Sequence, residues 1–132
     1  MMEMFNWWAI LVATVLAFVL GGLWYGPLFG KAWLAAMGKT EEEIEPSASP
    51  FIISFFTALV TAITLAWLVH ALSVQGWAAG ALLGLVAGIG FIATAMASDT
   101  AFCGWGVRLF IIQAGYRVVY SVVMGALLGG WQ

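Results

Sequence analysis

Residues 77–97, WAAGALLGLVAGIGFIATAMA, decide the class of fold to which this chain belongs. The stretch contains no charged side chain, and about 20 apolar residues in a helix suffice to cross about 30 Å of membrane hydrocarbon. Together with Gly76, the glycines Gly80, Gly84 and Gly88 recur at every fourth position. Because small residues let the backbones of membrane helices come close, the stretch predicts a transmembrane helix with a glycine-lined packing face.

The whole chain has the composition of a membrane protein. Of its 132 residues, 64% are hydrophobic and 8% are charged, whereas soluble domains are about 45–50% apolar and about 25% charged. We predict an all-α polytopic membrane protein that forms one domain over residues 1–132. Its four expected transmembrane helices cover about residues 7–25, 51–72, 77–97 and 107–128.

An amphipathic loop, residues 27–49, joins the first two spans. Pro27 is expected to end the first span, because proline has no N–H to donate to the helix. Phe29, Trp33 and Met37 then recur at every fourth position. This spacing predicts a short interfacial helix between the first and second spans.

The distribution of basic residues predicts the orientation of the spans. Lys31, Lys39 and Arg108 all belong to the two loops at one end, and basic loops favour the cytoplasmic side of a membrane. We therefore expect both termini on the external side.

The glycines predict where helices meet. The expected packing positions are Gly80, Gly84 and Gly88 in the third span and Gly125 and Gly129 in the fourth. Glycine is costly inside a helix and is useful there mainly where another backbone comes close. We expect these faces either to join copies of the chain into a homo-oligomer or to pack helices within the bundle.

One face of the fourth span collects polar side chains within an apolar helix. Gln113, Tyr116, Arg117, Tyr120 and Ser121 fall at helical spacing on that face. Such a face should point to the bundle interior, an oligomer axis or a water-filled cavity. It is either a hydrogen-bonded seam between helices or a functional surface.

Arg117 is the most costly residue in the chain, since a mid-membrane arginine costs roughly 2.5–3.5 kcal/mol to insert. Its expected partner is Asp99, a backbone carbonyl or a lipid phosphate. Asp99 ends the third span at the depth of Arg108, so an Asp99–Arg108 ion pair is the simpler expectation.

Several function classes are excluded by composition. The chain has no basic run that could neutralise a phosphate backbone, so nucleic acid is not an expected partner. A lone cysteine, Cys103, and a lone histidine, His70, cannot form an intrachain disulfide or supply a usual zinc site. Cys103 and His70 are also expected at opposite membrane faces, so they cannot form a catalytic pair. We therefore predict no catalytic residue and no enzymatic activity. We also predict no metal and no cofactor.

Two functions remain open. The first is a non-enzymatic membrane protein that binds lipid or a partner protein through its small-residue grooves, with Arg117 on the phosphate of an anionic lipid. The second is a homo-oligomeric channel or transporter for a small solute or anion, lined by the polar face of the fourth span.

Several motifs resemble those of a known family. They are Asn6-Trp7-Trp8, the stretch LWYGPLFGKAW at residues 23–33, Ala114-Gly115-Tyr116 and Met124-Gly125-Ala126-Leu127. The chain resembles a bacterial family of small integral membrane proteins, domain-of-unknown-function family number 1761, over nearly its whole length. The resemblance implies four spans in the bacterial cytoplasmic membrane and no known activity. The family pattern leads us to expect an uncharged side chain where this chain has Arg117.

Overall fold

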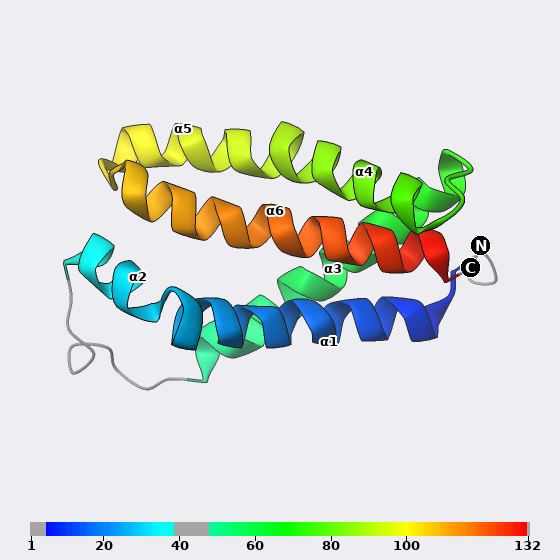
Figure 1. The fold of residues 1–132 in the computed structure, drawn as a ribbon, viewed down its shortest axis with the longest axis horizontal. Coiled ribbons are helices and arrows are strands. Elements are labelled where there is room, and N and C mark those ends of the chain that lie inside the picture. The colour runs from blue at the N-terminus through cyan, green and yellow to red at the C-terminus, as the bar shows by residue number, and fades with distance from the viewer. Residues whose placement is uncertain (1–4, 39–47, 132) are drawn as a thin grey trace.

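Long helices lie side by side and form a bundle (Figure 1). The computed structural model of the chain describes residues 5–38 and 48–131. Four helices in these ranges are long and apolar enough to cross a membrane, namely Trp7–Leu28, Ser49–Ala71, Trp77–Cys103 and Val107–Gly130. The predicted all-α fold with four spans is therefore confirmed.

Two of the long helices contain a π-helical turn. The first long helix is α1 (Trp7–Leu23) continued by η2 (Trp24–Leu28), and the third consists of α4 (Trp77–Ala87), η4 (Gly88–Ala93) and α5 (Thr94–Cys103). The second and fourth are α3 (Ser49–Ala71) and α6 (Val107–Gly130), and the short α2 (Gly30–Met37) follows η2.

The first span continues through Pro27 instead of ending at it. The Phe29 N–H donates to the Trp24 carbonyl at 2.8 Å, a bond to the residue five positions back that widens the helix into a π turn. The helix therefore reaches Leu28 with Pro27 inside it. The span therefore ends one residue beyond Pro27, because the wider turn carries the helix just past the residue that cannot donate.

The end of the third span and the end of α2 define the loops on either side of them. The third span reaches Cys103 rather than Ala97, so Asp99 lies inside α5. The short helix expected in the 27–49 loop is α2, which ends at Gly38 with a left-handed φ of 70° that favours glycine. Residues 39–47 of that loop, including Lys39, lie outside the described residues.

The beginning of α1 and the end of α6 meet at one end of the bundle. Asn6 Nδ2 donates to the Trp131 carbonyl at 3.1 Å, and the Gly76 N–H donates to the Gly129 carbonyl at 3.1 Å. Helix α2 and the turn between α5 and α6 lie at the opposite end (Figure 1). This arrangement is the one expected for an even number of spans.

A backbone-to-backbone contact joins α4 to α6. A methyl group added to Gly84 would meet the Ser121 carbonyl, and one added to Gly80 would meet the Gly125 carbonyl. In return, a methyl group on Gly125 would meet the Gly80 carbonyl. No side chain larger than hydrogen therefore fits between the two helices at these positions.

Gly88 and Gly129 extend the same contact. Gly88 faces Val118 and Ser121 of α6, and Gly129 faces Gly80 of α4. The glycine face of α4 is thus covered by α6 of its own chain. The groove is therefore occupied within one chain, and the expected homo-oligomer stays a prediction that would need a surface other than this groove.

The centre of the bundle is closely packed. Ile10, Thr14, Ser121 and Met124 are less than 2% exposed. The Thr14 hydroxyl donates to the Ile10 carbonyl at 2.8 Å, and the Ser121 hydroxyl donates to the Arg117 carbonyl at 2.8 Å. Both buried hydroxyl groups are therefore satisfied, as burial requires.

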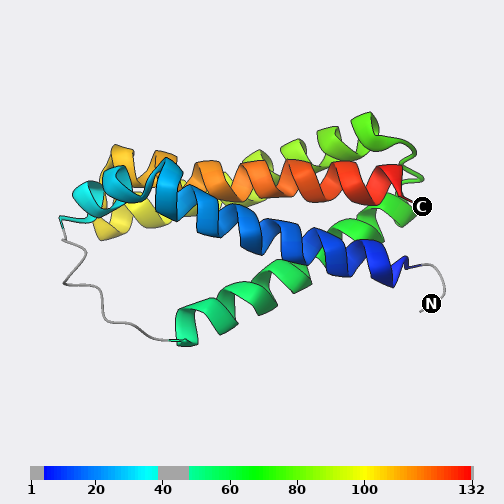
Figure 2. The ribbon, with the colours of Figure 1, turned by 60° about the horizontal axis from the view of Figure 1, so that its bottom comes forward.

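Helix α3 leaves the bundle along its first turns (Figure 2). Ala58, Ala62 and Ala66 are buried, whereas Ser54, one turn earlier on the same face, is exposed. Every residue from 49 to 54 is exposed. The start of α3 therefore stands away from the bundle at the end that carries α2.

Gly84→Ala is expected to destabilise the protein, because the added methyl group meets the Ser121 carbonyl and overpacking typically costs about 1–3 kcal/mol. Thermal unfolding in detergent, followed by circular dichroism, measures the loss. Gly22→Ala is the matched control, since a methyl group there meets nothing within 4 Å and alanine is the better helix former. Equal unfolding temperatures for the two variants would contradict the α4–α6 contact.

Candidate functional site

Tyr116 ties α6 to α1. Its hydroxyl donates to the Ala17 carbonyl at 2.8 Å. Gly21 makes room for this bond, because a methyl group there would lie 2.8 Å from the Tyr116 hydroxyl oxygen. Tyr116 is only 8% exposed, so the bond satisfies a polar group that water does not reach.

Aromatic rings surround Tyr116. Its ring centroid lies 4.9 Å from that of Tyr120, 5.4 Å from that of Tyr25 and 6.3 Å from that of Trp24. Trp24 also donates its indole N–H to the Ile112 carbonyl at 2.9 Å. The end of the first span is thereby attached to α6 by a hydrogen bond, by an edge-to-face contact between Tyr25 and Tyr116, and by a tilted contact between Trp24 and Tyr116.

Arg117 contacts two of these rings. Its guanidinium carbon lies 5.6 Å from the Tyr116 ring centroid and 5.8 Å from the Tyr120 ring centroid, within the range of a cation–π contact. Its Nη1 donates to the Tyr120 hydroxyl at 3.3 Å. A guanidinium has more N–H donors than this one bond uses, so part of its binding capacity is free.

No carboxylate neutralises Arg117 among the residues that the structure describes. Asp99 and Arg108 are both exposed, and within residues 5–38 and 48–131 no ion pair joins Asp99 to either arginine. The Asp99–Arg108 pair that their shared depth suggested is thus not formed in the described structure. Beyond η4, most residues of α5 are exposed, so Asp99 is not held against α6.

Arg117 lies near the middle of α6, ten residues after Val107 and about 15 Å along the helix axis, and its side chain leans toward the end of the bundle that carries α2. Side chains lean toward the N-terminus of their helix, and the N-terminus of α6 is at that end (Figure 1). Tyr116, which contacts the guanidinium, also contacts Tyr25, and the Tyr25 ring lies 5.0 Å from the ring of Trp33 in α2. Two ring contacts therefore connect Tyr116 to α2.

The polar face of α6 divides into a packed part and an open part. Ser121 is buried against the glycines of α4. Tyr116 and Tyr120 are also buried, whereas Gln113 and Arg117 are half-buried. The structure thus brings Tyr116, Arg117 and Tyr120 together, leaves Gln113 one turn away from Arg117, and assigns Ser121 to the contact between α4 and α6.

The contributions of Trp24 and Tyr25 were not predicted from the sequence. A signal for them was present, because Ala17, Gly21, Trp24 and Tyr25 fall at the spacing of one helical face. The same face that carries Ala17 and Gly21 to α6 therefore also carries the two rings there.

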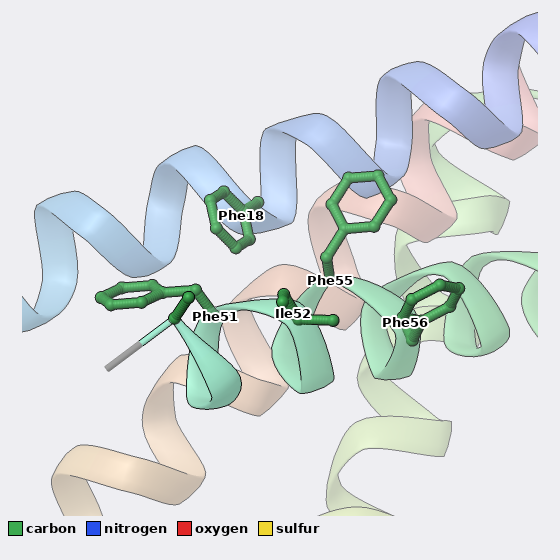
Figure 3. A pocket seen from close by; sticks show the side chains of 6 residues that line it. Phe18, Phe51, Ile52, Phe55 and Phe56 are labelled. Atoms are coloured by element: carbon green, nitrogen blue, oxygen red, sulfur yellow. The ribbon is translucent and has the colours of Figure 1, made fainter.

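A second feature is an apolar hollow between α1 and α3 (Figure 3). Phe18 lies 6.4 Å from Phe51 and 6.0 Å from Phe55 between ring centroids, and the lining is completed by Ala48, Ile52 and Phe56. None of these side chains carries a polar group. The hollow can accommodate a hydrocarbon chain but cannot recognise a charge, so Arg117 and its rings are the candidate site.

The cluster around Arg117 is suited to binding rather than to bond making. It offers a cation and free N–H donors, but Gln113, Tyr116, Arg117 and Tyr120 include no nucleophile paired with a base. Among the described residues, no group of three or more His, Cys, Asp or Glu side chains could hold a metal ion. An anionic or oxygen-rich ligand matches these groups best.

Tyr116→Phe should lower the free energy of unfolding by about 0.6–1.5 kcal/mol, because it removes one buried bond between helices and keeps the ring contacts. Unfolding in mixed micelles with rising dodecyl sulfate measures the change. Tyr25→Phe is the control, since the Tyr25 hydroxyl has no hydrogen-bond partner among the described residues. If Tyr116→Phe and Tyr25→Phe are both as stable as the parent protein, the hydrogen bond from Tyr116 to Ala17 has no structural role.

The comparisons with known proteins agree with the motifs. A family model described as "Protein of unknown function (DUF1761)" matches residues 8–129. No curated protein and no solved structure matches the chain. The resemblance seen in the motifs is confirmed, and since the match covers well over half of the chain, the protein belongs to the DUF1761 family.

Proposed function

We propose that this integral membrane protein binds the phosphate group of an anionic lipid at Arg117. The proposal is supported by the burial and the few partners of the Arg117 guanidinium. This group is half-buried, makes one hydrogen bond, and has no carboxylate partner among the described residues. An arginine side chain stays charged in proteins. A charged guanidinium in an apolar surrounding is stabilised by binding an anion.

The aromatic contacts lower the cost of the Arg117 charge but do not neutralise the charge. The two cation–π contacts contribute about 0.5–2 kcal/mol each, which is comparable with the roughly 2.5–3.5 kcal/mol that a mid-membrane arginine costs, but they leave the guanidinium without an opposite charge among the described residues. A phosphate group supplies both a compensating charge and several acceptor oxygens for the free N–H donors. Tyr116 and Tyr120 then serve as a platform that holds the guanidinium in place for the ligand.

A lipid is a better candidate than a conducted ion. The Arg117 side chain leans toward the α2 end, where the first turns of α3 are exposed, and in this proposal the headgroup reaches the guanidinium from that end. Farther along α6, Ser121 and Met124 are less than 2% exposed. A polar path through a single chain would have to pass these packed residues, and the α4 side of α6 is filled by the glycine contact.

The basic residues support an orientation for this site. Lys31 in α2 and Arg108 in α6 lie at the same end of the bundle, and basic residues favour the cytoplasmic side. The proposal therefore places Arg117 in the cytoplasmic leaflet of the bacterial cytoplasmic membrane, with both termini external.

Arg117→Met is expected to reduce retention of phosphatidylglycerol by roughly ten- to a hundredfold, because charged hydrogen bonds contribute about 1.5–3 kcal/mol. Native mass spectrometry of protein from mixed phosphatidylcholine and phosphatidylglycerol micelles measures retention. Arg117→Lys should retain an intermediate amount, since the charge remains and the planar fork is lost. Arg108→Met is the control, because Arg108 is exposed at the same end and should have little effect.

Two results would overturn this assignment. One is an Arg117→Met protein that folds and retains phosphatidylglycerol as the parent does. The other is displacement of the lipid by excess inorganic phosphate, which would show that the ligand is a soluble phosphate ion rather than a lipid.

Cys103 tests the orientation. Its thiol is exposed at the end of α5, so a membrane-impermeant maleimide should label it in permeabilised cells and not in intact cells. Phe5 precedes α1 at the other end of the bundle. A Phe5→Cys variant in a Cys103→Ser background should therefore be labelled in intact cells. Labelling of Cys103 in intact cells would reverse the orientation.

A further inference from the structure

We propose that Gln113 recognises the headgroup alcohol of the lipid held at Arg117, and that the ligand is a singly charged phospholipid whose headgroup carries free hydroxyl groups. This inference rests on the proposed function. It adds the chemical class of the headgroup and names the residue that selects it.

Gln113 lies next to Arg117 on the open part of the polar face. The two residues are four positions apart on α6, so they share a face and are separated by about 6 Å along the axis. Both side chains are half-buried. The Gln113 amide has no hydrogen-bond partner among the described residues, so its donors and its acceptor are available to a ligand.

The order of the two residues matches the order of groups in a phospholipid. Helix α6 begins at the end that carries α2 (Figure 1), so Gln113 is nearer that end than Arg117. Outward from the acyl chains, a phospholipid presents its phosphate first and its headgroup alcohol next. A phosphate held at Arg117 therefore places the headgroup alcohol at the level of Gln113.

The amide favours a hydroxylated headgroup over a charged one. A side-chain amide both donates and accepts hydrogen bonds, and a hydroxyl group does the same. An ammonium headgroup would bring a second cation beside Arg117, where the described residues provide no carboxylate partner. Phosphatidylglycerol combines a single negative charge with free hydroxyl groups and thus fits both residues.

The test compares two lipids that differ only in the headgroup alcohol. Phosphatidylglycerol and phosphatidylethanol carry the same charge, but phosphatidylethanol has no hydroxyl group. In a native mass spectrometry competition from phosphatidylcholine micelles, the parent protein should retain phosphatidylglycerol roughly two- to tenfold better, as expected for one net hydrogen bond. Gln113→Met should reduce that ratio to about one and leave retention of phosphatidylethanol unchanged.

Gln75→Met is the matched control, since Gln75 is exposed in the turn at the opposite end, and it should keep the parent's ratio. An unchanged ratio in Gln113→Met overturns the role of Gln113, as does an equal loss of both lipids, which would show a structural role. If the parent retains neither lipid over phosphatidylcholine, the proposed function itself fails. If the parent retains phosphatidylglycerol and phosphatidylethanol equally, the headgroup preference is overturned and the proposed phosphate binding at Arg117 still stands.

Discussion

The contact between the backbones of α4 and α6 constrains the rest of this structure. Gly80 and Gly84 meet the carbonyls of Gly125 and Ser121 with no side chain between them. In a membrane, helices gain little from the hydrophobic effect and associate through close packing, so this contact fixes how α6 is rotated about its own axis. Once one face of α6 is committed to α4, its remaining faces have defined neighbours.

The aromatic cluster follows from that rotation. With Ser121 turned toward α4, Tyr116 points to α1 and reaches the Ala17 carbonyl. The rings of the first span close around Tyr116, and Arg117 is left half-buried beside them. The polar face that looks uniform on a helical wheel therefore has two parts: a buried part that holds helices together, and a half-buried part with a charge that no described residue neutralises.

The sequence predicts the number and placement of the spans because span length and hydropathy depend on local composition alone. It predicts neither π-helical turn, since hydrogen bonds five residues apart leave no periodic mark in a short segment. Glycine spacing indicates where backbones come close, but it cannot say whether the neighbour is the same chain or another copy. The Asp99–Arg108 pair is not formed among the described residues, because equal depth on two neighbouring helices does not turn two side chains toward each other.

If a lipid phosphate holds the charge of Arg117, the guanidinium nitrogen and the lipid phosphorus must lie close together. In an Arg108→Lys protein, Arg117 is the one arginine of the chain, so nitrogen-15 arginine labelling marks its guanidinium alone. Solid-state NMR in phosphatidylglycerol bilayers can then measure the dipolar coupling from the guanidinium nitrogen to lipid phosphorus. We expect a coupling that corresponds to about 4 Å, the separation across a charged hydrogen bond to phosphate. A folded protein without any such coupling would show that no lipid phosphate is bound at Arg117.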